Sequence, residues 1–337
     1  MVGRAFLAVV LAMTGQGGGA ADAPTRASGG LLLVTNKGDQ TLGIIDPGLG
    51  KQVATVKESG ITGHEVIASP DGKTAYVPIY GNSGVGKPGT DGQTLDVIDI
   101  ASRRRVATID FGQAERPHCP QFGPDGKLYV STEITNSITV IDPATHKVLG
   151  KVPTDQPESH MFAITKDGKR AFTSNVHPGS VSAIDLVARK VLATIPISPY
   201  SQRIALSVDD RRAFTADQNE PRLAVIDTAT NKVERFVALP GSAYGTAPTP
   251  DGRFLVMALP TLNKVGVLDL QSMQLTHIFD VPKAPQEVLV RPDGLFAYVS
   301  CDASAKVAAI DLKAWKVDRL IDAGPMADGL AWAVAQP

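Results

Sequence analysis

Short apolar segments alternate along the chain with turns that are rich in Gly, Pro, Asp and Asn. One stretch shows the unit completely: HMFAIT from His160, the turn KDG, RAFTSN from Arg170, a loop, VSAID from Val181, a turn, and KVLATI from Lys190. Segments of this length, rich in β-branched residues and bounded by turn formers, predict strands. No window keeps an apolar period of 3.6 residues, so we expect helices to be nearly absent.

The unit repeats, and two independent markers give the same period. One marker, here called the ring position, stands seven residues before the Asp of a recurring Asp-Gly turn, and its register continues to the last copy: His64, His118, His160, Gln202, Tyr244, Gln286 and Asp328. Five of its six steps are 42 residues. The other marker is the Asp that closes the third strand: Asp46, Asp99, Asp142, Asp185, Asp227, Asp269 and Asp311. Only the first step is long in both series, and the excess falls in a glycine-rich insertion at 81–92.

Four strands in about 42 residues are the signature of a β-propeller blade. The chain begins with a second-type strand near Leu31 and ends with a first-type strand near Gly329. Three N-terminal strands and one C-terminal strand therefore complete one blade, which removes the exposed edges of an open ring. The sequence predicts an all-β fold, a seven-bladed β-propeller of four antiparallel strands per blade, as a single domain over 30–335.

The repeat resembles a known family. Val34-Thr35-Asn36 beside TLGIID from Thr41, and PDGKTAYV from Pro70, are similar to the YVTN-type repeat of the YncE-like seven-bladed propellers. The resemblance covers 30–335 and implies the same fold. It implies no single activity, because fold and function are separable and the family holds binding proteins and surface-layer components, with lactonases, lyases and copper or haem enzymes among related propellers.

Composition narrows the class of partner. The chain has 33 basic and 34 acidic residues in 337, a formal net charge of −1. Because no basic patch is readable and the three consecutive arginines at 103–105 fit a solvated strand edge, we expect no nucleic-acid partner. We expect a monomer whose partner is a protein or a small molecule.

The N-terminus predicts export. Arg4 precedes a short apolar run, Ala5 to Met13, and small residues follow, with cleavage expected after Ala20 or Ala23. This is the pattern of a signal peptide over 1–23, and the apolar run is too short to span a bilayer. We therefore expect a periplasmic or secreted location and no membrane span. Cys119 and Cys301 occupy different positions of non-adjacent repeats, so two free, buried thiols are favoured over a disulfide.

Candidate chemistry gathers at the ring position. In a propeller the innermost strands start on one face, around the channel mouth, and the second strands end there too. Residues at the ring position are therefore expected to circle the mouth, with Tyr80 and Glu133 outside them. Three of the chain's six histidines, His64, His118 and His160, stand at this position in consecutive blades.

Three interpretations of these histidines stay open. Repeats that descend from one ancestor can share a His without a function, and such a His can bond a neighbouring loop carbonyl. Alternatively, three neutral imidazoles can bind a transition metal ion (Cu, Zn, Fe or Mn), with Gln202, Glu133 or Asp328 as a further ligand or as an orienting group. In a metal-free version, His acts as acid or base beside Tyr80 or Tyr244 and Glu65 or Glu133.

Two functions follow from these interpretations. The first is an exported binding or scaffold propeller that presents its channel-mouth face to a protein or a small ligand. The second is a periplasmic enzyme with a His-based, metal-dependent site at the mouth, of lyase, lactonase or oxidoreductase type.

Overall fold

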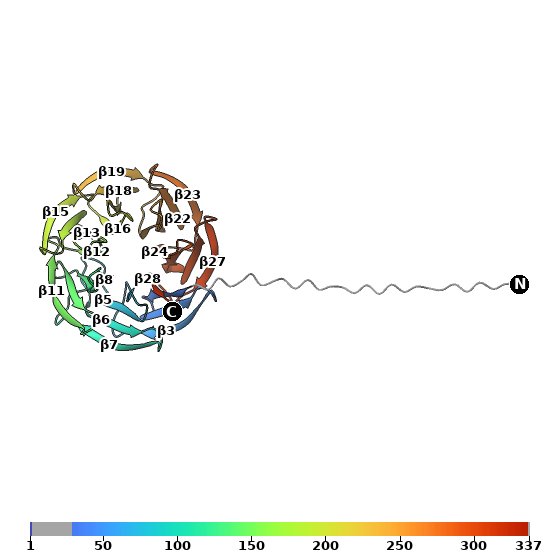
Figure 1. Ribbon diagram of the computed structural model, residues 1–337, viewed down its shortest axis with the longest axis horizontal. Helices are drawn as coiled ribbons and strands as arrows, with labels where there is room; N and C mark the ends of the chain where they lie inside the picture. The colour runs from blue at the N-terminus through green and yellow to red at the C-terminus, as the bar shows by residue number, and fades with distance from the viewer. Residues whose placement is uncertain (2–28, 336–337) are drawn as a thin grey trace.

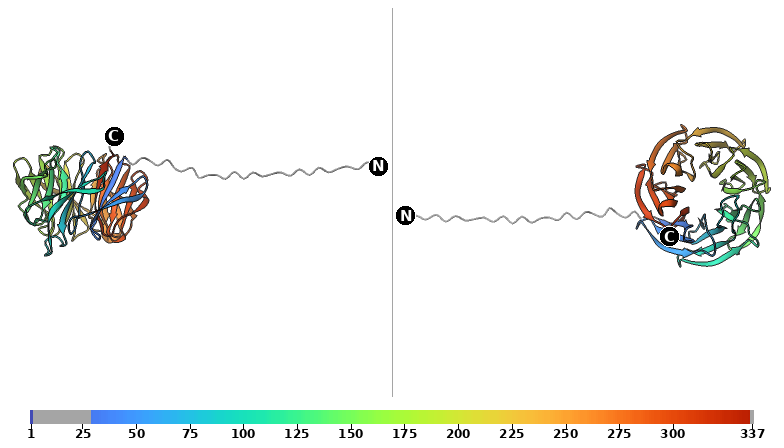
Figure 2. Two further views of the ribbon diagram at one scale, coloured as in Figure 1. Left: turned by 90° about the horizontal axis from the view of Figure 1, so that it is seen from below. Right: turned by 180° about the vertical axis from the view of Figure 1, so that it is seen from behind.

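Seven four-stranded antiparallel sheets form a closed ring around a central axis (Figure 1). This computed structural model describes Met1 and residues 29–335, so the signal peptide expected over 1–23 lies, apart from Met1, outside the described residues. Figure 2 shows the ring from its side and from behind. The predicted fold class, a seven-bladed propeller with four strands per blade, is confirmed.

The strands follow one another from the axis to the rim in each blade. Blade 1 joins the chain ends, and its strands from inside to outside are β28 (Ala327–Val334), β1 (Gly30–Asn36), β2 (Thr41–Asp46) and β3 (Lys51–Lys57). Blades 2 to 4 comprise β4 (Ile67–Ala68), β5 (Thr74–Gly81), β6 (Asp91–Asp99), β7 (Arg104–Asp110); β8 (Pro117–Phe122), β9 (Leu128–Thr132), β10 (Ser137–Asp142), β11 (Lys147–Pro153); and β12 (Ser159–Ile164), β13 (Arg170–Asn175), β14 (Ser180–Asp185), β15 (Lys190–Pro196).

The remaining three blades have the same order. They comprise β16 (Ser201–Leu206), β17 (Arg212–Asp217), β18 (Arg222–Asp227), β19 (Lys232–Ala238); β20 (Thr246–Pro248), β21 (Phe254–Leu259), β22 (Lys264–Asp269), β23 (Gln274–Asp280); and β24 (Pro285–Val290), β25 (Phe296–Cys301), β26 (Lys306–Asp311), β27 (Lys316–Asp322). The described residues contain no α-helix, only the 3-10 turns η1 (Pro260–Leu262) and η2 (Asp302–Ser304). No helix in this part of the chain is long and apolar enough to cross a membrane.

The Asp residues of both recurring turns shape the backbone around them. The Asp that closes the third strand accepts hydrogen bonds from backbone N–H groups two or three residues later, as Asp46 does from Gly48 at 2.8 Å and from Leu49 at 3.1 Å. Four residues after each of these Asp residues the backbone takes a positive φ, at Gly50, Arg103, His146, Arg189, Asn231, Met273 and Trp315. In the Asp-Gly turns the Asp accepts from the N–H two residues on, as in Asp167 to Lys169 at 3.0 Å. Local turn chemistry of this kind sets the register of each hairpin.

The hydrophobic core lies between the blades. One cluster joins Ile138 of β10, Ile184 of β14 and Ile226 of β18, which are fully buried. Cys119 and Cys301 are both buried and free within the described residues, as the sequence predicts. Strands β1 and β28 pair from Gly30 to Val334 at one end and from Asn36 to Ala327 at the other, so the chain termini close the ring through backbone hydrogen bonds.

The connection from blade 1 to blade 2 buries a carboxyl group. Glu58 follows β3 and accepts hydrogen bonds from the Gly63 N–H at 2.7 Å and from the Thr62 hydroxyl at 3.1 Å. Burial raises the pKa of Glu58 to about 7, although both hydrogen bonds act to lower it. The folded protein therefore holds this proton at pH values where the unfolded chain has lost it, and stability falls as the pH rises from about 4.5 to 7.

Replacing Glu58 by glutamine is expected to remove this pH dependence. The amide oxygen keeps both acceptor bonds, and no charge remains to be buried. We expect Glu58→Gln to be about 2 kcal/mol more stable than the wild type at pH 8 and nearly equal to it at pH 4.5. Urea unfolding of both proteins at the two pH values measures the difference. An equal difference at both pH values would show that Glu58 is not the titrating group.

Candidate functional site

Three histidine rings from consecutive blades are in contact at the axis. His64 lies just before β4, His118 lies in β8 and His160 lies in β12. The ring centroids of His64 and His118 are 5.4 Å apart, and those of His118 and His160 are 3.8 Å apart with an interplanar angle of 37°. Tyr80, from β5, adds a fourth ring at 4.8 Å from His64 and 5.1 Å from His118. The structure therefore brings together the three histidines that share the ring position.

These imidazoles are uncharged near neutral pH; His118 and His160 are buried and His64 is half-buried. His118 and His160 are 2% and 4% exposed. Burial lowers the pKa of His64 to about 4, and it lowers the pKa of His160 to about 3, with the positive charge of Arg203 acting in the same direction on both. Burial and the two neighbouring histidines hold the pKa of His118 well below its usual range. Neutral imidazole is the form that binds transition metals, whereas such low pKa values make these rings weak bases at pH 7.

A buried ion pair connects the histidine cluster to the glycine-rich insertion. The Tyr80 hydroxyl donates to Glu133, whose other oxygen accepts from Arg116 at 2.9 Å and from the Gly86 N–H at 3.0 Å. Arg116 also donates to the Lys87 carbonyl at 2.6 Å. Burial and the charge of Glu133 raise the pKa of Tyr80 above its usual range, so the hydroxyl keeps its proton. Glu133 is therefore occupied as an acceptor for three donors.

A charge cluster lies around Arg203, on β16. Its guanidinium, 4% exposed, is paired with Glu287 of β24, with Glu65 at 2.9 Å and with Asp328 of β28 at 3.3 Å. It also lies over the ring of Tyr244, 4.7 Å from the centroid. Four blades thus contribute partners to one arginine from a fifth. We call Arg203, Glu65, Glu287 and Asp328, with Lys37 beside Asp328, the axial charge cluster.

The acidic members of this cluster titrate unusually. Burial raises the pKa of Glu65 to about 8, against the opposing effect of Arg203, and burial also raises the pKa of Glu287. Lys37 lies 2.9 Å from Asp328 and 3.5 Å from Asp302. Buried ionisable groups with shifted pKa values that meet at a channel are typical of functional sites, since ion pairs in a low-dielectric interior add little net stability.

Several buried polar atoms at the ring position lack partners. Within the described part of the chain, His118 Nδ1, His160 Nδ1 and Gln202 Oε1 have no hydrogen-bond acceptor or donor. These three residues stand on the consecutive inner strands β8, β12 and β16. Buried polar atoms are nearly always bonded in native proteins, so three orphans at one level of the channel need an explanation.

We call the level of the channel that holds His118, His160 and Gln202 the polar layer. A cavity of about 490 Å³ occupies the channel beside it. Every inner strand contributes to its wall, from Glu65 before β4 to Trp332 of β28. Glu65, Glu287 and Cys119 line it next to the polar layer, and the residues that follow them, toward the Asp-Gly turns, are mainly apolar. This volume is within the range of small-molecule sites.

The predicted candidates divide between two groups. His64, His118, His160, Tyr80 and Glu133 form one connected set. Asp328 belongs to the axial charge cluster, and the Tyr244 ring lies under the guanidinium of Arg203. Gln202 donates to the Tyr200 hydroxyl at 3.2 Å. Sequence reasoning missed Arg203, Glu287, Lys37 and Arg116. Arg203 and Glu287 each follow a ring-position residue, as Glu65 does, so charge at the next position in three repeats was a signal.

The metal hypothesis meets a geometric difficulty. Among the described residues, no three His, Cys, Asp or Glu side chains form a group that could hold a metal ion as they stand. Three imidazoles on one ion would have ring centroids about 5 Å apart, given metal–nitrogen distances of about 2.0–2.1 Å. The His64–His118 spacing fits this value, but the His118 and His160 rings would have to move apart.

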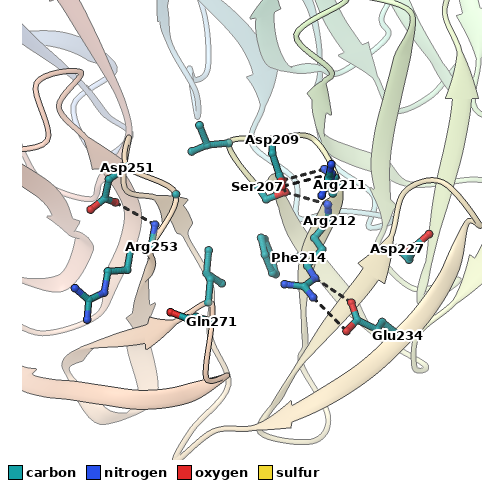
Figure 3. A pocket seen from close by; sticks show the side chains of 13 residues that line it. Ser207, Asp209, Arg211, Arg212, Phe214, Asp227, Glu234, Asp251, Arg253 and Gln271 are labelled. Carbon is teal, nitrogen blue, oxygen red and sulfur yellow. Dashed lines mark hydrogen bonds and ion pairs between the residues drawn. The ribbon is translucent and has the colours of Figure 1, made fainter.

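A second hollow, of about 770 Å³, lies between blades 5 and 6 on the face of the Asp-Gly turns (Figure 3). Two of its arginines are already paired: Arg212 with Glu234 at 2.9 Å, and Arg253 with Asp269 at 3.5 Å. Arg211 is 86% exposed in its side chain. Exposed, mutually paired charges of this kind contribute little binding specificity or stability, so the channel remains the stronger candidate.

Comparison with known proteins supports the fold only. No protein-family model and no curated protein matches the chain. Among solved structures, a chain of Kuenenia stuttgartiensis hydrazine synthase is similar, with a TM-score of 0.73 and 20% sequence identity over 89% of this chain and 99% of that chain. At this identity the likeness shows a shared propeller fold and nothing of the activity. Membership of the YVTN-type, YncE-like family stays a prediction from the repeat sequence.

Proposed function

We propose that this protein is an exported binding protein whose ligand is a small molecule held in the central channel, at the layer formed by the three histidines and the axial charge cluster. A propeller fold suits a binding role, because its inner strands present many side chains to one axis. One observation carries the proposal: the unpartnered atoms of His118, His160 and Gln202, on three consecutive inner strands beside a cavity. A ligand with polar groups at this level would supply their missing hydrogen bonds.

The test is a fragment screen with the folded protein. A library of several hundred polar fragments is added to ¹⁵N-labelled protein, and the amide and imidazole signals of β8, β12 and β16 are followed by NMR. We expect hits that perturb these strands, and we expect His118→Leu to lose them. His277→Leu is the matched control, since His277 lies on the outer strand β23 and outside the channel. The proposal fails if no fragment perturbs the inner strands, or if hits survive His118→Leu unchanged.

The second candidate is a metal-dependent enzyme, which the contact of three neutral imidazoles favours. His64, His118 and His160 would hold the ion after the His118 and His160 rings separate, and a bound ion would supply Lewis-acid chemistry. Untagged protein is dialysed against Cu²⁺, Zn²⁺, Fe²⁺ or Mn²⁺ and its metal content is measured. Stoichiometric metal that is lost in the triple His→Ala variant supports this candidate. Metal content below about one tenth of an ion per chain removes it.

A further inference from the structure

The channel cavity has ionisable side chains at one end, and the wall beyond them is formed mainly by apolar residues, with polar and apolar groups exposed to the cavity in about equal measure. Its wall includes Val66, Phe162, Ile204, Leu289, Leu330 and Trp332, and Glu65 and Glu287 line it at the polar layer. Apolar walls with few polar groups at one end are typical of sites that take a ligand with an apolar body and a single polar head. The ionisable residues at the charged end of the cavity therefore determine which polar head group a ligand would carry.

The axial charge cluster has more carboxyl groups than cations. Glu65, Glu287 and Asp328 share Arg203, and Lys37 pairs with Asp328. Three carboxyl groups, with Asp302 as a fourth 3.5 Å from Lys37, thus face two cations. Within the described residues, Glu65 Oε1 has no partner other than the guanidinium nitrogen of Arg203 that lies 2.9 Å away. Glu65 is 5% exposed, so bulk water does not serve this oxygen.

The sign of the missing charge follows from these contacts. An anionic head would face Glu65 and Glu287 at the inner end of the cavity, while Arg203 is already paired with three carboxyl groups. With a neutral head, Glu65 would stay protonated at pH 7, because burial and the nearby Glu287 and Asp328 raise its pKa to about 8. An ammonium head supplies both the missing positive charge and N–H donors.

We propose that the channel cavity binds an amphiphilic amine, with its ammonium group paired to Glu65 and Glu287 and its apolar body along the wall. This proposal rests on the proposed function, since it names the class of ligand that the channel takes. The amine would complete the axial charge cluster in the way that a second lysine would, and Arg203 would keep the two glutamates in place.

Three probes with the same apolar body test the head group: phenethylamine, 2-phenylethanol and phenylacetate. The chain has two tryptophans, and only Trp332 lines the cavity, so its indole N–H signal reports occupancy. The signal is assigned with Trp332→Phe. Titrations at pH 7 are expected to give a dissociation constant for phenethylammonium about tenfold or more below that for 2-phenylethanol, and no binding of phenylacetate.

Variants locate the ion pair. Glu65→Gln and Glu287→Gln should each weaken phenethylammonium binding by about tenfold and leave 2-phenylethanol binding unchanged. Glu220→Gln is the matched control, because Glu220 is exposed on the loop between β17 and β18. The three probes are compared on the wild-type protein, so this test of the head group remains valid even if a variant fails to fold.

The outcomes separate this proposal from the proposed function. Equal affinity for amine and alcohol, or tighter binding of phenylacetate, overturns the amine proposal and leaves channel binding intact. The amine proposal also fails alone if none of the three probes shifts Trp332 while library fragments perturb the inner strands. If neither probes nor fragments perturb the channel, both proposals fail.

Discussion

Replacing Arg203 by methionine is expected to lower the free energy of unfolding by about 4 kcal/mol at pH 7. Methionine fills a similar volume, so the loss comes from charge rather than from a cavity. Glu65, Glu287 and Asp328 would stay buried with only Lys37 nearby as a cation and the Tyr244 ring beside them. Removing one partner of a buried ion pair is more costly than the pair itself is worth, because the remaining charges keep their desolvation cost.

The pH dependence distinguishes this mechanism from simple loss of packing. Without the guanidinium, the pKa values of Glu65 and Glu287, already raised by burial, rise further in the folded state, and Asp328 loses one of the positive charges that lower its pKa. Groups of this kind destabilise the fold as the pH rises, so the deficit of the variant should be smaller at pH 5 than at pH 8. Urea unfolding at both pH values measures it, with the exposed Arg211→Met as control, for which we expect a change within about 0.5 kcal/mol. A deficit below about 1 kcal/mol, or one that is independent of pH, would contradict this account.

The fold could be predicted from the sequence because its signals are local and repeated. Asp46 and its six equivalents each cap a hairpin, and the Asp-Gly turns each fix a register, so the period was visible at every copy. The closure by β28 beside β1 followed from the type of the first and last strands. Hydrophobic periodicity, turn chemistry and repeat length pointed to one architecture, which is what a well-specified fold requires.

The candidate site could be predicted only where it follows the repeat. His64, His118 and His160 share one position and therefore meet on adjacent blades. Arg203 breaks the pattern, since it spans the axis to partners that are 84 and 125 residues away in sequence. The register of the repeat predicts where the Cα atom of a residue lies. It does not predict which partners a long side chain contacts across the channel. For the same reason the sequence places Tyr244 and Asp328 at the ring position but does not predict their contacts with Arg203.

Glu133 connects the insertion at 81–92 to the histidine cluster. Its carboxylate accepts from Tyr80, from Arg116 and from the Gly86 N–H, and Tyr80 contacts the rings of His64 and His118. The insertion is the largest departure from the repeat, yet its backbone is held at Gly86 and Lys87 by this one buried ion pair. Loss of Glu133 would therefore lower the stability of the fold, loosen the backbone of the insertion and release the Tyr80 hydroxyl from its acceptor.

Glu133→Leu is expected to lower the free energy of unfolding by about 3 kcal/mol, because Arg116 keeps only Asp91 and the Lys87 carbonyl as partners in a buried place. The Gly86 amide loses its acceptor, so its hydrogen exchange should speed up by about tenfold or more, while amides of β13 keep their wild-type rates. Glu133→Gln retains an acceptor oxygen and should lose about half as much stability. Urea unfolding and hydrogen exchange followed by NMR measure both effects, with Glu220→Leu as the exposed control. If Gly86 exchanges at the wild-type rate in Glu133→Leu, the insertion is held by other contacts, and Glu133 does not couple it to the histidines.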